Sequence, residues 1–305
     1  MTIFLQATVE GLSLAAIYSL VAIGFVLIYK SMDVLSFAQP ALAVVGAGII
    51  SSLAVDRGIP FWLALILGIF LTGVLSLIIE RTFLRPMVGE PVFSVAILTI
   101  GIDILLRTVL DSWIGINPRY LGDPFPTFGN FGAINVGGVN LKFLELTALV
   151  TAILIILILS VFFKRSKYGV AMRATSFDQE AALAQGINVG RIFGLAWFIA
   201  GILAAFAGFF ITGGFNTLGQ FSFLIALRAL PAVVIGGLDS IPGAVVGSII
   251  GLTQGYVAYY QIPFENLIGF SLGSGFSLLA PYLIMFVILI FRPDGLFGTE
   301  EVERV

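Results

Sequence analysis

Apolar residues occur in long runs along this chain, and short polar connections separate the runs. Most runs approach the roughly 20 residues that a helix needs to cross a bilayer, so each predicts a spanning helix. The runs are Gly11–Tyr29, Val34–Val55, Pro60–Ile79, Val92–Leu110, Phe143–Phe163, Ile192–Thr212, Phe223–Leu238, Gly243–Tyr260 and Phe276–Phe291. The pattern predicts an all-α polytopic membrane protein in which residues 1–305 form a single transmembrane domain.

The run Phe223–Leu238 is shorter than the others and contains Pro231. Proline removes a helical hydrogen bond, and a broken or re-entrant helix is tolerated in a membrane only where protein or water covers its backbone. We therefore expect about nine crossings, or eight with this segment re-entrant.

A polar island, Lys164–Arg191, separates two of the spanning runs, and its first part is basic. By the positive-inside rule this island lies in the cytoplasm. The connections that carry Lys30 and the Arg81–Arg85 stretch are also basic, and they alternate with connections poor in basic residues. This alternation places the N-terminus outside, and Arg292 after the last run places the C-terminus inside. The first residues lack the basic stretch of a cleaved signal peptide, so we expect the first run to remain as a span.

The second part of the island predicts a short helix, Phe177–Gln185. Ser176 can cap its start, and Gln179 would complete a capping box. Gly186 suits the left-handed residue after the last turn, and Asn188 can cap the following spanning helix. A docking element and an ordinary amphipathic connector both fit this pattern.

The connection 113–142 is the longest one predicted outside the membrane. Within it, Ala133–Val136 and Val139–Lys142 flank Gly137-Gly138, which predicts a β-hairpin with a two-residue turn. A folded docking surface and a plain connector both remain open for this connection.

Several polar residues fall inside the predicted spans. Asp103 and Arg107 are four residues apart and can pair on one helix face, either as a pathway pair or as a neutralised structural pair. Arg228 can face a polar cavity or extend to the interface. The candidates for a translocation pathway are Tyr18, Ser36, Gln39, Thr99, Asp103, Arg107 and Arg228.

Glycines recur every four residues at Gly243, Gly247, Gly251 and Gly255. Such a stripe lets a second helix approach closely, so it predicts helix packing. The residues Ala200, Ala204 and Gly208 repeat the device on a second run.

Composition narrows the possible functions. The chain has 305 residues, 59% of them hydrophobic and 10% charged, with a mean hydropathy of +1.10. It has no His and no Cys, which excludes imidazole and thiol chemistry. The formal net charge of −2 gives no basic excess for nucleic acid. With scattered carboxylates and no GxxxxGK phosphate loop, we expect no catalytic residue, metal or cofactor in this chain.

Five motifs occur in a recognisable order. They are Gly11–Tyr29 (similar to GLxxGxxYALxAxG), Glu80–Gly89 (ERxxxRPxxG), Gly169–Asn188 (GxAxRAxxxDxxAAxxxGIN), Gly236–Gly243 and Arg292–Gly298. Together they resemble the permease subunits of bacterial ABC importers for branched-chain amino acids, a family that includes urea and amide permeases.

This resemblance implies partners. The chain would pair with a homologous second permease in the bacterial cytoplasmic membrane, above two cytoplasmic ATPases that hydrolyse ATP and below an external solute-binding protein. Phe177–Gln185 would be the coupling helix seated on an ATPase. The implied coupling residues are Arg173, Asp178, Glu180, Ala181, Ala182, Gly186, Ile187 and Asn188.

One segment departs from the family pattern. Where the family has NFAxG, this chain has Ser36–Pro40, reading SFAQP. The substrate therefore stays open among branched-chain amino acids, related hydrophobic carboxylates, amides and urea. Two other classes were weighed: an ATP-independent transporter or channel, which would show inverted repeats, and an intramembrane enzyme, which would need clustered catalytic groups.

Overall fold

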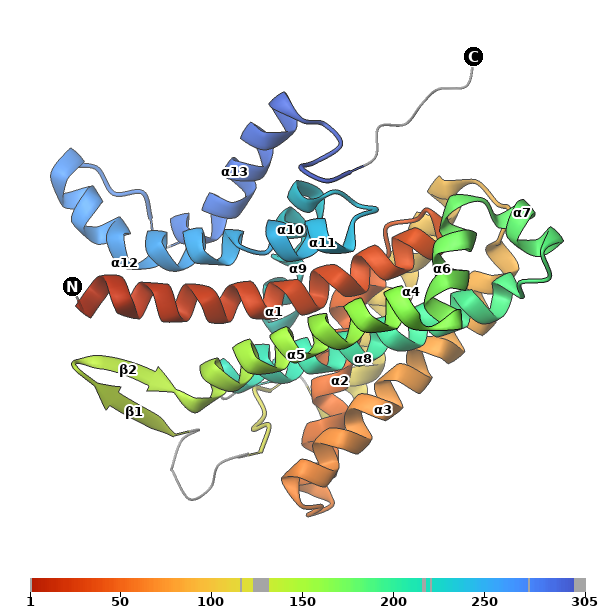
Figure 1. The fold of residues 1–305 in the computed structure, drawn as a ribbon. Helices are drawn as coiled ribbons and strands as arrows, with labels where there is room; N and C mark the ends of the chain where they lie inside the picture. Colours follow the sequence, from red (N-terminus) through yellow and green to blue (C-terminus); the bar gives the residue numbers. More distant parts are fainter. Residues whose placement is uncertain are drawn as a thin grey trace.

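The computed structural model describes residues 2–115, 117–122, 132–215, 218–219, 221–273 and 275–298. In this part the chain is a bundle of helices with one short hairpin (Figure 1). The longer helices are α1 (Thr2–Met32), α2 (Ala38–Ser51), α3 (Phe61–Ile79), α4 (Val92–Ile114), α5 (Phe143–Arg165), α6 (Lys167–Phe177), α8 (Val189–Phe215), α12 (Ile250–Ile268) and α13 (Phe276–Phe291). The shorter elements are π-helices η1 (Ser52–Asp56) and η2 (Glu80–Leu84), 3₁₀-helix η3 (Arg85–Met87), helices α7 (Gln179–Ala184), α9 (Phe221–Leu227), α10 (Leu230–Gly236) and α11 (Ile241–Gly247), and strands β1 (Ala133–Val136) and β2 (Val139–Lys142).

Helix α1 is the centre of the bundle (Figure 1). In its most apolar stretch 89% of the residues are buried, and it packs against α8, α12, α5, α11 and α10. A helix that is apolar all round must be enclosed by other helices or by lipid, and here other helices enclose it. Helix α5 is the opposite case, since only 17% of its corresponding stretch is buried. It therefore lies at the periphery of the bundle.

Small residues set the close contacts of α8. Ala200 and Ala204 are fully buried, and a Cβ on Gly208 would overlap with the Ala43 carbonyl of α2. A Cβ on Gly201 would lie 2.8 Å from the Thr72 carbonyl of α3. Lipid tails are as apolar as leucine, so such backbone-to-backbone fit is a main source of helix association in membranes.

The predicted glycine stripe serves two different neighbours. Gly243 and Gly247 of α11 lie against the backbone of α10. Gly251 and Gly255 lie against α1, where an added Cβ would be 2.8 Å from the Ala15 Cα and 2.7 Å from the Gly11 Cα, respectively. The first half of the stripe therefore packs α11 against α10, and the second half packs α12 against the central helix α1.

Two apolar runs are interrupted. The predicted break in Phe223–Leu238 is confirmed: α9 ends at Leu227, and α10 begins with Pro231 in its first turn, where its missing N–H is harmless. The run predicted as Gly243–Tyr260 is not one regular helix, because α11 ends at Gly247 and α12 begins at Ile250. The two are joined by i→i−3 hydrogen bonds such as Gly251 N to Ser248 O, 2.9 Å.

The predicted hairpin is confirmed at its predicted bounds, with Ala133 opposite Lys142 and positive φ at both turn glycines. Its free edge is closed by a side chain of α1. The Gln6 amide donates to the Asn140 carbonyl, 3.0 Å, and accepts from the Asn140 N–H, 2.8 Å, as a neighbouring strand would. The rest of the predicted external connection includes residues 123–131, which lie outside the described residues.

The all-α polytopic prediction is confirmed. Seven helical segments of the described chain are long and apolar enough to cross a membrane, and two shorter apolar segments, Ser222–Gly236 and Phe276–Phe291, bring the apolar segments to the nine predicted runs.

Candidate functional site

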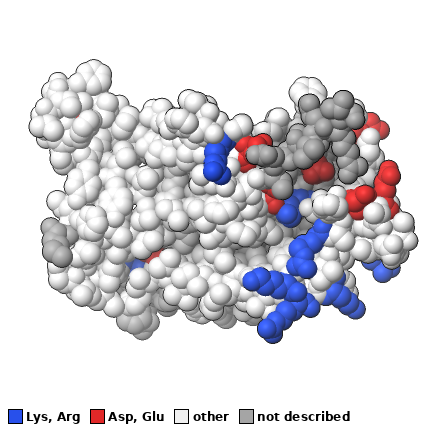
Figure 2. All heavy atoms as spheres, turned by 45° about the horizontal axis from the view of Figure 1, so that its top comes forward, with Lys and Arg blue, Asp and Glu red and all other residues white. Residues whose placement is uncertain are grey.

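The two ends of the bundle differ in charge. At one end, here called the basic end, α1, α3 and α5 finish and α6 and α7 lie; at the other, the hairpin end, lie β1 and β2 (Figure 1). Figure 2 shows Lys and Arg gathered toward one end of the visible face, together with several Asp and Glu, while most of the remaining surface is uncharged. The polar island of the sequence lies at the basic end.

The island contains two helices, and this corrects the predicted cap. Residues Lys167–Phe177 form α6, so Ser176 lies inside a helix and caps nothing. Asp178 is the N-cap of α7, and its Oδ1 accepts from the Ala181 N–H, 2.9 Å. Gln179 is consequently the first residue of α7 and not the third. The single helix predicted at Phe177–Gln185 is in fact the six-residue α7, preceded by a sharp turn.

Both signals at the end of α7 are present as predicted. Gly186 has φ of +80°, and the Ile187 N–H donates to the Ala182 carbonyl, 3.0 Å. Asn188 Oδ1 accepts from the Arg191 N–H, 3.0 Å, and so caps the first turn of α8. Because only these few residues separate α7 from α8, the two helices are joined by a short, hydrogen-bonded connection.

The faces of α7 are unequal. Ala182 is only 3% exposed and packs against the chain itself, so it does not lie on the outward face with Ala181. The outward face of α7 carries Leu183, 57% exposed, and the last residue of α6, Phe177, is 94% exposed. Asp178, Glu180, Gly186 and Asn188 are exposed as well, and Ile187 is half-buried.

Arg173 anchors α6 to the preceding helix. Its guanidinium donates to the Phe163 carbonyl at the end of α5, and the Ser166 hydroxyl accepts from the Gly169 N–H, 2.9 Å, as the N-cap of α6. A Cβ on Gly169 would lie 2.6 Å from the Phe163 Cα, so only glycine allows this turn between α5 and α6. Local contacts thus fix α6 on the end of α5.

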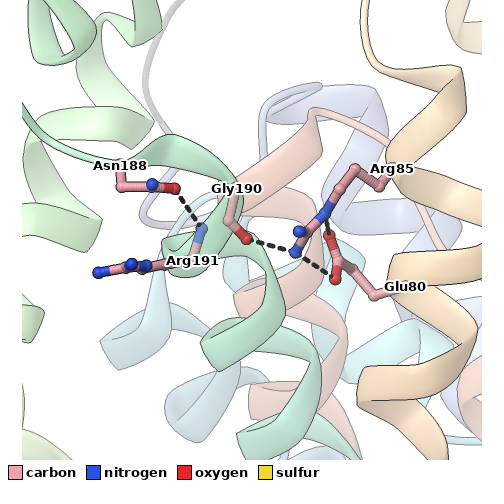
Figure 3. Close-up of polar contacts among 5 residues, drawn as sticks. All are labelled: Glu80, Arg85, Asn188, Gly190 and Arg191. Atoms are coloured by element: carbon pink, nitrogen blue, oxygen red, sulfur yellow. Dashed lines mark hydrogen bonds and ion pairs between the residues drawn. The ribbon is translucent and has the colours of Figure 1, made fainter.

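Directly after α3, Glu80 and Arg85 form an ion pair, and Arg85 also reaches the start of α8 (Figure 3). Arg85 donates to both carboxylate oxygens of Glu80, Nε to Oε1 at 3.0 Å and Nη2 to Oε2 at 2.9 Å. The same Nη2 donates to the Gly190 carbonyl, 2.7 Å. Glu80 is fully buried and Arg85 is 37% exposed. This clamp, Glu80–Arg85–Gly190, therefore connects α3 directly to the island.

Sequence spacing did not predict the clamp, because residues five apart are not neighbours on an α-helix. Here Glu80–Leu84 forms a π-helix, in which the Arg85 N–H bonds to the Glu80 carbonyl and brings the two side chains together. The ERxxxRP motif marked the residues but not their partner Gly190.

The pathway candidates fall into two groups. In the first, the Tyr18 hydroxyl donates to Gln254 Oε1, 2.6 Å, with both side chains buried. Arg228, at the turn between α9 and α10, interacts electrostatically with Tyr18 and with Tyr282 of α13. Gln254 and Tyr282 belong to this group but were not singled out from the sequence, because their partners are distant in the chain.

The second group surrounds the start of α2. Gln39 lies between α1 and α8 and donates to the Ala200 carbonyl, 3.1 Å, and Thr99 Oγ1 accepts from the Phe37 N–H, 3.1 Å. Ser36 Oγ and Gln39 Oε1 are buried and have no hydrogen-bond partner within the described part of the chain. Tyr18, Ser36, Gln39 and Thr99 are all enclosed in this conformation.

Asp103 and Arg107 form the predicted ion pair on α4, and Arg107 also lies over the Phe223 ring, 4.2 Å from its centroid. Arg107 reaches a cavity of about 340 Å³ whose apolar wall includes Leu110 and Phe223 and which also contains Asp111. Helix α9 thus contacts Arg107 through Phe223, and its end leads to Arg228 of the first group.

The last described residues complete α10. The Leu296 N–H donates to the Ile235 carbonyl, 2.8 Å, and the Phe297 N–H donates to the Gly236 carbonyl, 3.1 Å. These are carbonyls that the end of a helix leaves without an intrahelical partner. Gly295, with φ of +80°, makes the turn that allows this approach. The Arg292–Gly298 motif is therefore a cap for α10.

The arrangement of motifs can now be compared with known proteins. The family described as "Branched-chain amino acid transport system / permease component" matches residues 7–291. The chain belongs to this permease family.

Curated relatives cover nearly the whole permease. It is 27% identical over 314 residues to the high-affinity branched-chain amino acid transport system permease protein BraD of Pseudomonas aeruginosa, covering 99% of this chain and 98% of BraD. It is 26% identical over 316 residues to the high-affinity branched-chain amino acid transport system permease protein LivH of Escherichia coli K12, covering 99% of this chain and 98% of LivH. A shorter match, 26% over 171 residues and 54% of this chain, is to the galactose/methyl galactoside import permease protein MglC of E. coli K12, of which it covers 49%.

These matches favour the importer permease over an ATP-independent transporter or an intramembrane enzyme. The relatives that match are named for chemically different solutes, branched-chain amino acids and galactose. Family membership alone therefore does not define the substrate of this permease.

Proposed function

We propose that this permease is one half of the membrane part of an ATP-driven importer and that the outward face of α6 and α7 docks on a cytoplasmic ATPase. The observation that carries the proposal is the exposure of Phe177 (94%) and Leu183 (57%) at the basic end. Large apolar side chains on a polar surface mark interaction sites. A groove on the ATPase would cover them.

The contacts around the island can transmit movement of this surface. A push on α7 passes through Gly186 and the Asn188 cap into the first turn of α8. The clamp on Gly190 adds α3 to the same unit. Helix α8 packs against α1, α2 and α3, so movement at the ATPase would reach the centre of the bundle. Asp178, Glu180 and Ala181 would contact the ATPase, Arg173 would hold α6 on the end of α5, and Ala182 would hold α7 to the chain.

The charge distribution supports an orientation. The basic end would face the cytoplasm and the hairpin end the outside, with the N-terminus outside and the C-terminus inside a bacterial cytoplasmic membrane. A homologous permease would complete the membrane part, a second ATPase would serve that permease, and a solute-binding protein would deliver solute at the hairpin end. ATP hydrolysis would take place on the ATPases.

For the substrate we propose a branched-chain amino acid or a related small carboxylate. The relatives BraD and LivH are named for branched-chain amino acid transport. The cavity beside Arg107 combines a guanidinium and the Asp111 carboxylate, which suit the two charged groups of an amino acid, with the apolar side chains of Leu110 and Phe223. Its volume of about 340 Å³ lies within the range of small-molecule sites.

The docking surface can be tested by co-purifying the permease with its ATPases. We expect Phe177→Asp to weaken retention of the ATPases roughly 30-fold, because truncating a central aromatic anchor costs at least about 2 kcal/mol. Val136→Asp is the matched control, since Val136 is 57% exposed at the hairpin end, far from the proposed ATPase. Equal retention by the Phe177 variant and the parent would refute the docking surface.

The substrate is tested in proteoliposomes that contain the whole importer, by measuring both solute uptake and ATP hydrolysis. Leucine, isoleucine and valine should stimulate ATP hydrolysis, while galactose and urea should not. Arg107→Gln should raise the KM for the amino acids. Stimulation only by an uncharged solute would refute the proposed substrate, and uptake without the ATPases would instead support an ATP-independent transporter.

A further inference from the structure

A second cavity, of about 630 Å³, lies at the basic end between α1, α5 and α11. Its walls are apolar, with Ile156 and Leu159 of α5 on one side and Val245 and Val246 of α11 on the other. Helix α5 is peripheral, and Val246 is 37% exposed. The cavity, here called the α5–α11 groove, is therefore an apolar groove at the outer surface of the bundle, within reach of lipid chains.

The mouth of this groove is cationic. Lys30, Lys164 and Arg173 line it, against a single carboxylate, Asp239. The Lys30 ammonium donates to the Asp239 carbonyl, 2.7 Å, and the Arg173 guanidinium donates to the Phe163 carbonyl. These contacts hold two of the cations in place, and each cation retains further N–H donors for an anion.

The mouth also lies at the depth of lipid headgroups. Lys30 is in the last turn of α1, and Lys164 is in the last turn of α5. A cationic cluster just beyond the apolar part of two spanning helices lies where lipid phosphates lie. The apolar walls continue from the mouth toward the membrane interior, in the direction an acyl chain would take.

We propose that the α5–α11 groove binds an anionic phospholipid, with the phosphate at Lys30, Lys164 and Arg173 and one acyl chain against the walls of α5 and α11. A soluble anion would use the three cations but leave the apolar walls uncovered. A zwitterionic lipid would fill the walls but would not match the net positive mouth. An anionic lipid satisfies both features. Binding of this kind requires only that the chain spans a membrane, so it does not depend on the proposed transport function.

Native mass spectrometry of the purified chain tests the proposal directly. With matched acyl chains, phosphatidylglycerol should remain bound in preference to phosphatidylcholine. Each charge removed, as Lys30→Gln or Lys164→Gln, should weaken phosphatidylglycerol binding about fivefold. Arg165→Gln is the matched control, since Arg165 lies in the same basic stretch but does not line the groove. Lys164 is exposed, so its variant should fold even where Lys30→Gln does not.

Equal binding of the two lipids, or an equal loss in the Arg165 variant, would overturn the proposal. A second measurement identifies the occupant in membranes. A photoreactive residue in place of Val246 should cross-link to lipid, whose mass the labelled peptide would carry. Cross-linking to another protein instead would show that the groove is a subunit interface and would also overturn the proposal.

Discussion

The clamp between α3 and α8 supports a quantitative prediction. In Arg85→Met, the buried Glu80 loses both of its hydrogen bonds to the guanidinium, 3.0 and 2.9 Å long, and Gly190 loses its donor. Removing one member of a buried ion pair typically costs about 3–5 kcal/mol, because the remaining charge is left without compensation. Since Arg85 is 37% exposed, water can reach the site in part. We therefore expect about 3 kcal/mol, the lower end of this range.

The double variant Glu80→Gln with Arg85→Met separates the cost of the stranded charge from the value of the pair. Without the carboxylate, the double variant should recover more than half of the lost stability. Unfolding in SDS, followed by tryptophan fluorescence or circular dichroism, measures both values. Lys142→Met is the comparison, because its pair with Glu145 is a single contact of 3.0 Å to a half-exposed lysine and leaves a carboxylate that is 13% exposed, whereas Glu80 is fully buried. Its loss of stability should therefore be smaller than that of Arg85→Met.

The reasoning would be refuted if Arg85→Met cost no more than Lys142→Met, or if the double variant were less stable than the single one. Arg85→Lys adds a geometric test. It keeps the positive charge but cannot form the two parallel bonds to Glu80, so its stability should lie between those of the parent and Arg85→Met. Activity of the reconstituted importer then reports whether the clamp also matters for coupling.

Three further changes follow from the packing and the turns. Gly208→Val should abolish assembly of the bundle, because even a Cβ overlaps with an α2 carbonyl, whereas Gly101→Ala, where a Cβ meets nothing within 4 Å, should leave expression and detergent stability unchanged. Gly186→Ala should cost about 1–2 kcal/mol by SDS unfolding, because φ is +80° although the space around it is open; a loss equal to that of Gly101→Ala would contradict this. Gln254→Leu should cost about 1 kcal/mol by leaving the buried Tyr18 hydroxyl without its acceptor, and adding Tyr18→Phe should restore most of it unless the hydroxyl finds another partner.

Local signals in the sequence predicted local structure well. A two-residue hairpin turn with positive φ at both central positions favours glycine, Gly137 and Gly138 supply it, and the hairpin has its predicted bounds. Gly186 and Asn188 act through neighbours within a few residues, so their capping roles were visible as well. The predicted N-cap role of Ser176 is wrong, because α6 already includes this serine. Asp178, two residues later, is an equally good cap and caps α7 instead.

Long-range partners were not predictable from a single sequence. Gln39 donates to a carbonyl in α8, and nothing near it in the chain indicates that contact. The interruption after Gly247 contains no proline, and its Gly247-Ser248 pair, a type found at helix kinks, was read only as part of the packing stripe. Exposure was equally hidden: Ala181 and Ala182 look alike in the sequence, yet only the first faces outward.

The central position of α1 has a consequence for how the protein is made. Ribosomes synthesise α1 before α8 and α12, which enclose it, so α1 reaches the membrane before these two neighbours. The solvation free energy of its apolar side chains is nearly the same in lipid as in the bundle, because lipid tails are as apolar as the bundle interior. Packing of the later helices around α1 therefore depends on close fit between helix backbones, as at Gly251 and Gly255 of α12, and the hydrophobic effect contributes little to it.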